Sequence, residues 1–167
     1  MTYLDLQADP DVAHPVDAIE TIAGVNDWEY ERDSADEIVI TTRGAHTTYT
    51  VAFTWLDEIS SLHVSCTFEL GVPGHRHTEV TRLLRRINEQ LWLGHFDMWE
   101  DDKVILYRHS HVLGATDELS HDVAQMLLQS ALSNCDMYYQ AFHFVVWAGQ
   151  SAEQAMQATM FETVGEA

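Results

Sequence analysis

Histidine is the residue type here with the most capacity for chemistry, because ten histidines occur among the 167 residues. His109 and His111 stand two positions apart at the end of an expected strand, which places both imidazoles on one face, and His95 is the candidate third ligand. The sequence has no HExxH motif and no carboxylate at a spacing that would complete such a site. We therefore expect structural or solvent-exposed histidines, with no bound metal and no cofactor. A metal-binding protein or small metal-dependent enzyme built on His95, His109 and His111 is the alternative.

The candidate nucleophiles are two cysteines, Cys66 and Cys135, which lie in unrelated contexts without a CxxC motif. Cys66 falls on the apolar side of its expected strand and Cys135 precedes Asp136, so neither thiol is in a setting that favours the thiolate. The sequence also lacks a GxSxG motif and a phosphate-binding GxxxxGK loop. The sequence therefore predicts no catalytic residue and two free thiols, as is usual in the cytoplasm.

Charge narrows the classes of partner. With 27 acidic residues against 8 lysines and arginines, the net charge is -19, which repels nucleic acid and anionic lipid. The longest nearly apolar stretch, 141–148, is far shorter than the roughly 20 residues that a bilayer requires, and the first residues do not resemble a signal peptide. We therefore expect a cytoplasmic protein that binds neither nucleic acid nor membrane.

The elements that must position these side chains follow from hydrophobic periodicity. Alternation over 46–56 and 59–70, joined at Asp57–Glu58, indicates an antiparallel pair of strands with one covered and one wet face. A two-residue turn would give the apolar pairs Phe53–Leu62, Val51–Val64 and Tyr49–Cys66. The other expected elements are helix 15–23, strands 28–31 and 37–42, helix 76–92, a second hairpin of 93–99 and 103–111, and two C-terminal helices. The predicted fold is α+β, an antiparallel sheet flanked by helices in the order α-β-β-β-β-α-β-β-α-α.

Helix 76–92 is expected to cover the apolar face of the sheet and to carry Arg76, Arg82, Arg85 and Arg86, half of all basic residues, on its other side. Pairing with Glu79 and Glu89 on a solvated face is the preferred interpretation. A basic patch that faces a partner is the alternative.

The C-terminal third is expected to be helical over residues 116–165. A single helix over 116–148 would span about 50 Å, longer than the roughly 40 Å expected for a compact domain of this size. We therefore expect a break near Ser133–Asp136. A last helix should start at Ser151, because Ser151-Ala-Glu-Gln154 has the form of a capping box.

The broadest apolar helix face belongs to this last third. Apolar residues wrap well over half the circumference of 137–146, more than a surface helix needs. Deep burial and a protein-binding surface both account for this width. The candidate protein-binding residues are Tyr138, Tyr139, Phe142, Val145 and Val146.

Three stretches, 79–99, 104–109 and 142–149 continuing through 160–167, together resemble the YbjN family of bacterial proteins. Gln140 is a departure, since a proline is expected there after the tyrosine pair. The resemblance implies a fold similar to type III secretion chaperones, commonly dimeric and acidic, and a non-catalytic role in sensory transduction or stress regulation. Fold likeness does not establish chaperone activity.

The resemblance extends over nearly the whole chain. We expect an acidic tail over residues 1–14 and a single YbjN-like domain over 15–167. The expected function is a protein-binding module, chaperone-like or regulatory, which forms a homodimer and binds a protein partner.

Overall fold

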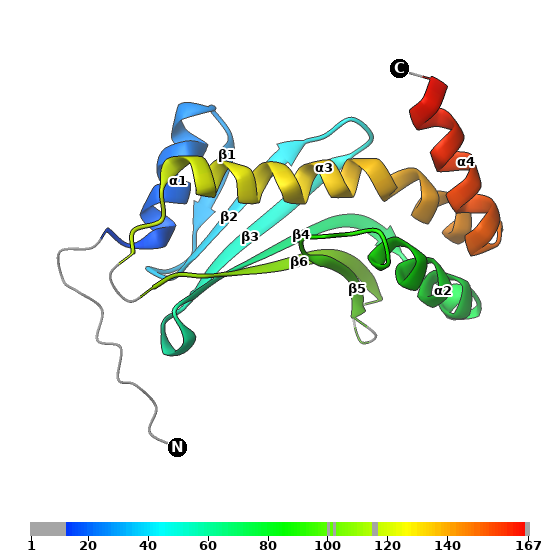
Figure 1. The fold of residues 1–167 in the computed structure, drawn as a ribbon, viewed down its shortest axis with the longest axis horizontal. Helices are drawn as coiled ribbons and strands as arrows, with labels where there is room; N and C mark the ends of the chain where they lie inside the picture. The colour runs from blue at the N-terminus through cyan, green and yellow to red at the C-terminus, as the bar shows by residue number, and fades with distance from the viewer. Residues whose placement is uncertain (1–12, 100, 102, 115–116, 166–167) are drawn as a thin grey trace.

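The structure, a computed structural model, describes residues 13–99, 101, 103–114 and 117–165. Over these residues the chain forms one six-stranded antiparallel sheet with the strand order β1-β2-β3-β4-β6-β5, together with four α-helices. The predicted α+β class and element order are confirmed (Figure 1). The elements are α1 (Pro15–Val25), β1 (Glu29–Arg32), β2 (Glu37–Arg43), β3 (Thr48–Leu56), β4 (Ser61–Gly71), α2 (His77–Asn88), β5 (His95–Trp99), β6 (Val104–Val112), α3 (His121–Val146) and α4 (Ala152–Gly165).

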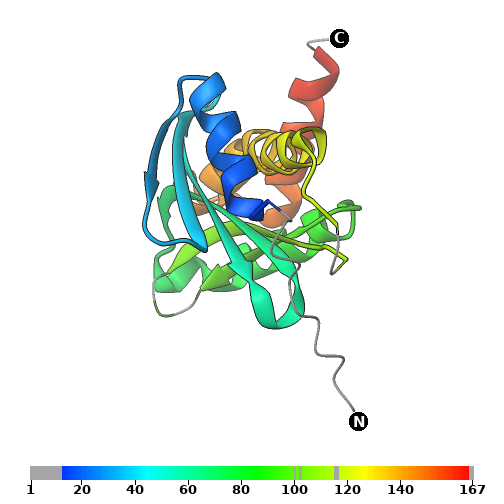
Figure 2. The ribbon, with the colours of Figure 1, turned by 90° about the vertical axis from the view of Figure 1, so that its left-hand side faces the viewer.

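The helices cover one face of the sheet. Figure 2, which looks roughly along α3, shows the sheet curving around this helix with α1 beside it. Alternate residues of β3 and β4 enter the core on that side, and Phe53, Val64 and Cys66 are completely buried there. The residues between them face the opposite, open side of the sheet. The predicted division into a covered and a wet face is therefore correct.

The register of the first hairpin differs from the prediction by two residues. Phe53 pairs with Val64, not Leu62, and Val51 pairs with Cys66. The connection includes a 3-10 turn over Asp57–Ile59 and ends at Ser60, whose φ of 46° is left-handed. Because the connection is longer than two residues but the shift is even, every side chain keeps its predicted face.

The long helix α3 is continuous over 26 residues and spans about 39 Å, so the predicted break is wrong. It begins after Ser120, whose hydroxyl accepts a hydrogen bond from Val123 N, whereas Thr116, where the helix was expected to begin, lies outside the described residues. The polar residues at the expected break have partners that leave the helix intact. Asn134 donates to Ser130 O one turn back, and Asp136 accepts from groups on and beside β3.

The capping box that was predicted for the last helix is confirmed. Ser151 Oγ accepts from Gln154 N at 3.2 Å, and Gln154 Oε1 accepts from Ser151 N at 3.0 Å. This reciprocal pair starts α4 immediately after the turn that follows α3.

Helix α2 ends four residues earlier than predicted. Its apolar residues Val80, Leu83, Leu84 and Ile87 are buried, as expected from their spacing. Asn88 then bonds both backbone groups of Phe96, donating to the carbonyl at 2.9 Å and accepting from the amide at 2.8 Å. These two bonds fix the end of α2 against the start of β5.

The second hairpin contributes one inner strand and one edge strand. β6 lies between β4 and β5, whereas β5 forms the edge and pairs only with Val104–Arg108 of the longer strand. Phe96 and Tyr107 face the core, and Leu106 is buried although it belongs to the opposite face. Between the two strands of this hairpin, residues 100 and 102 lie outside the described residues.

One arginine joins α2 to the connection between the two C-terminal helices. Arg76 donates from Nε to Val145 O at 2.7 Å and from Nη2 to Gln150 O at 2.5 Å. The side chain thereby satisfies a carbonyl of the last turn of α3 and holds the following loop.

We expect the Arg76→Ala substitution to lower the free energy of unfolding by about 2–3 kcal/mol, because both carbonyls lose a charged donor. Urea denaturation measures this change. The matched control is Arg85→Ala, whose side chain is 83% exposed and whose loss should cost about 0.5 kcal/mol or less. Equal effects of the two substitutions would contradict the proposed role of Arg76.

Candidate functional site

The five residues that were predicted to bind protein lie mostly in the core. Phe142 and Val145 are fully buried, Tyr138 and Val146 are 6% and 5% exposed, and only Tyr139 is half-buried. Of the two explanations given for the width of this apolar face, burial within the chain therefore accounts for four of the five residues. Participation of this segment in binding stays a prediction that rests on Tyr139 and on neighbouring surface residues.

The coverage of these residues comes from three directions. Phe142 packs against Phe68 of β4 and Phe96 of β5, with ring centroids 6.0 and 5.3 Å away. Tyr138 packs against Phe96 on the side of α2, and its hydroxyl lies 3.4 Å from Gln90 Oε1. The sheet, α2 and α4 all pack against α3 and together cover the apolar side chains of this helix.

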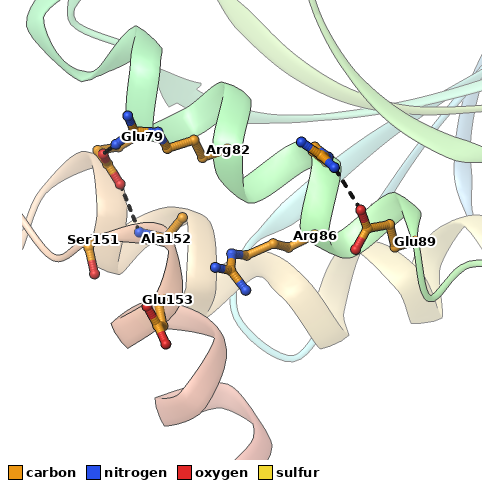
Figure 3. A pocket seen from close by; sticks show the side chains of 8 residues that line it. Glu79, Arg82, Arg86, Glu89, Ser151, Ala152 and Glu153 are labelled. Atoms are coloured by element: carbon orange, nitrogen blue, oxygen red, sulfur yellow. Dashed lines mark hydrogen bonds and ion pairs between the residues drawn. The ribbon is translucent and has the colours of Figure 1, made fainter.

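A groove lies between α2 and the first turn of α4. It has a volume of about 540 Å³, and Figure 3 shows charged side chains of α2 reaching toward the first turn of α4. The residues that line it are Glu79, Arg82, Arg85, Arg86, Glu89, Ser151, Ala152 and Glu153. The arginine-rich face that was noted in the sequence is thus one wall of this groove.

Ion pairs occupy part of the groove. Glu79 pairs with Arg82 and also accepts from Ala152 N at 3.0 Å, and this backbone bond is the main cause of its lowered pKa. Arg85 pairs with Glu89 at 3.3 Å, so the predicted pairing with both glutamates is confirmed for Arg82 and Arg85. It is wrong for Arg76, which was expected on the same solvated face but bonds the connection between α3 and α4. Within the described part of the chain Arg86 has no hydrogen bond or ion pair, and Figure 3 shows its guanidinium extending over α4.

A second cavity adjoins the groove at Arg86 and is lined by both polar side chains and methionines. This cavity of about 210 Å³ shares Arg86, Glu89 and Glu153 with the first and adds Gln90, Met156, Gln157 and Met160. Two residues after Gln90 comes Trp92, which is 98% exposed, followed by Leu93 at 56%. Two exposed apolar side chains thus follow closely in sequence after Gln90, which lines this second cavity.

Helix α3 also exposes apolar side chains on the side of Ser130. Tyr107 Oη is 3.0 Å from Leu93 O and 3.4 Å from Ser130 Oγ, so the loop before β5 lies beside Ser130. Met126 and Met137 are one turn before and two turns after Ser130 and are 62% and 50% exposed. We call Trp92, Leu93, Met126 and Met137 the apolar surface. The sequence analysis did not predict this surface. The feature that could have indicated it is the adjacent Trp92 and Leu93 just after the end of a helix.

The three histidines of the alternative metal site do not lie on one face of the sheet. In the register of β6, His109 is opposite Val64 and His111 opposite Leu62, on the helix side, whereas His95 is opposite Arg108 on the open side. Among the residues that the structure describes, no group of three or more side chains is placed to hold a metal ion. His95 and His109 instead line a small cavity together with His63.

Both cysteines are free, as predicted, and both are buried. Burial raises the pKa of the Cys135 thiol, and the neighbouring Cys66 thiol adds to the rise. The two thiols therefore lie close together between α3 and β4, a proximity that their separation in sequence did not indicate. Both residues are thus small side chains of the core.

Comparison with known protein families shows to which family the chain belongs. Residues 15–144 match the model of the family YbjN, whose description reads "Putative bacterial sensory transduction regulator". The chain belongs to the YbjN family. The YbjN description names regulators and not enzymes. No curated protein matches the chain, and no helix of the described residues is long and apolar enough to cross a membrane.

The residues that match the YbjN family form only one of the two walls of the groove. The match includes α2, the loop with Trp92 and most of α3, and it ends before α4. One wall of the groove and the apolar surface are therefore within the matched region, and the α4 wall is supplied by residues beyond it.

Proposed function

We propose that this YbjN protein is a non-catalytic regulatory module that acts by binding protein, and that its working form is a homodimer. The family description supports a regulatory role. The burial and raised pKa of the Cys135 thiol support a structural role for that residue. A chaperone role, implied by the resemblance to type III secretion chaperones, stays a prediction.

The observation that carries the proposal is the apolar surface beside the groove. Trp92 is almost entirely in water, and Leu93, Met126 and Met137 are each at least half exposed. Burying a large apolar side chain contributes about 1.5–3 kcal/mol, and tryptophan is among the usual anchors of protein interfaces. A protein that covers this surface would therefore gain several such contributions.

We propose that a second copy of the chain covers the apolar surface, because the groove beside this surface lacks the net negative charge of the chain as a whole. Two copies that each carry a net charge of -19 repel one another over most of their surfaces. The groove is different, since its three arginines balance its three glutamates, and residues 123–135 of α3 contain no charged side chain. A two-fold interface at this place would let Arg86 of one copy pair with Glu153 of the other.

Charge reversal tests this pairing by multi-angle light scattering at low ionic strength. Arg86→Glu and Glu153→Arg should each weaken the dimer at least about tenfold, because each creates a like-charge contact. The double variant should recover to within about threefold of the wild type, because it exchanges the two charges. A wild type that stays monomeric, or a double variant weaker than both single ones, would contradict the homodimer.

The apolar part of the interface has its own control. Trp92→Ser should weaken the dimer about tenfold or more, whereas Ile59→Ser, at a side chain 62% exposed on the distant β3–β4 connection, should not. Sedimentation velocity separates the two variants. Equal behaviour of both would place the interface elsewhere.

A further inference from the structure

We propose that the open side of the sheet carries a binding site for a small oxyanion, of phosphate or carboxylate chemistry. The site is a cavity of about 270 Å³ lined by His63, Gly94, His95, Arg108, His109 and Ser110. This volume is below the range of about 300–1,000 Å³ that is usual for larger organic ligands. The inference does not depend on the proposed dimer.

Strand register brings the polar groups of the site together. His63 of β4 pairs with Ser110 of β6, and His95 of β5 pairs with Arg108. Residues 108 and 110 share one face of β6, so all four side chains are on the open side. His63 Nδ1 lies 3.0 Å from Ser110 Oγ, which orients the ring.

His109 belongs to the other face of β6 but reaches the cavity at the strand edge. β5 begins only at His95 and pairs with β6 no further than Arg108. The edge of β6 beyond that point has no strand beside it among the described residues.

The charge of the lining favours an anion. No carboxylate lines this cavity, although the chain has 27 acidic residues, whereas three glutamates line the groove between α2 and α4. Arg108 makes one long ion pair, 3.3 Å from Nη1 to Asp97, and its buried Nε has no hydrogen-bond partner in the described structure. A guanidinium with unused donors is well suited to an oxyanion.

The histidines couple this site to pH. The pKa of His63 is lowered, first by burial and then by Arg108, His95 and His109, and the pKa of His109 is lowered mainly by burial. His111 further lowers the pKa of His109, Asp97 pairs with Arg108 outside the lining of the cavity, and the β3 neighbour of His63 is the uncharged Thr54. A bound anion opposes the positive charges, so binding should raise the pKa of His63 and should strengthen as pH falls.

NMR titration of the full chain with inorganic phosphate tests the site, with acetate as a second probe. At constant ionic strength, saturating phosphate should raise the pKa of His63 by about half a pH unit or more. The affinity for acetate, whose own charge does not change between about pH 6 and pH 8, should be at least about threefold higher near pH 6 than near pH 8. His75, an exposed histidine outside the site, should not respond.

Two variants separate binding from folding. Arg108→Gln should weaken phosphate binding at least about tenfold, and His63→Gln should remove most of the pH dependence while the folded spectrum is retained. His75→Gln is the matched control. The proposal is overturned if neither probe shifts His63 more than His75, or if Arg108→Gln, folded by its spectrum, binds as tightly as the wild type.

Discussion

Replacing Phe142 with alanine is expected to lower the free energy of unfolding by about 3–5 kcal/mol, the usual cost of removing a large aromatic side chain from a core. The ring is fully buried and packs against Phe68 and Phe96. The cavity would lie between α3 and the sheet, where these rings give little room for collapse. Urea denaturation at low protein concentration, where association does not contribute, measures the change.

This substitution separates a core role from the binding role that was predicted for the same residue. The matched control is Trp147→Ala, another large aromatic at the end of the same helix but 67% exposed, which should cost about 1 kcal/mol or less. If Phe142→Ala left stability unchanged but abolished self-association, Phe142 would belong to an interface and its burial in the single chain would not describe the protein in solution.

Local patterns in the sequence correctly predicted those structural features that depend on a single segment of the chain. The capping box at Ser151–Gln154 and the buried stripe of α2 depend on neighbours three or four positions away, and both are confirmed. The register of the first hairpin was not determined in this way. Two-residue alternation is unchanged by a shift of two, so only the geometry at Ser60 could distinguish the pairings.

The continuity of α3 depends on distant residues. The argument for a break compared a helix length with the diameter of a compact domain, but α3 begins five residues later and ends two residues earlier than expected and lies along the sheet (Figure 1). Asp136, taken as part of a break, is held by partners about 90 positions earlier in the chain. No pattern within the helix indicates such partners.

The candidate site was predictable only in part. The arginines of α2 were evident in the sequence, but the groove requires α4, whose first residues lie about 70 positions later. The oxyanion site likewise combines three strands, and His63 was not singled out because its neighbours in sequence have no ligand spacing. Residue type indicated the chemistry, and tertiary pairing determined which side chains meet.

Asp136→Ala is expected to destabilise the fold by about 2–3 kcal/mol, because the buried Tyr49 hydroxyl loses a charged acceptor and the exposed Ala45 amide loses its bonds to the same carboxylate. Asp136 Oδ1 accepts from the Tyr49 hydroxyl at 2.6 Å, and both carboxylate oxygens lie 3.0 Å from Ala45 N. Tyr49 is fully buried, and burial together with Asp136 raises the pKa of its phenol far above the usual value. Asp136→Asn keeps an acceptor oxygen and should cost about half as much. Chemical denaturation of both variants provides the comparison.

A glycine beside this network gives an independent test with a matched control. A Cβ added at Gly44 would lie 2.2 Å from Tyr49 Cε2 and 2.6 Å from Asp136 Oδ1, so Gly44→Ala must displace the ring from its acceptor. We expect a loss of about 2–4 kcal/mol. A Cβ at Gly24, inside α1, meets nothing within 4 Å, and Gly24→Ala should be neutral or stabilise by up to about 1 kcal/mol, since glycine is unfavourable within a helix. If Gly44→Ala in the Asp136→Ala background cost as much as in the wild type, the two effects would be independent. The close contact of Gly44, Tyr49 and Asp136 requires instead that the second substitution cost clearly less once the first has broken the network.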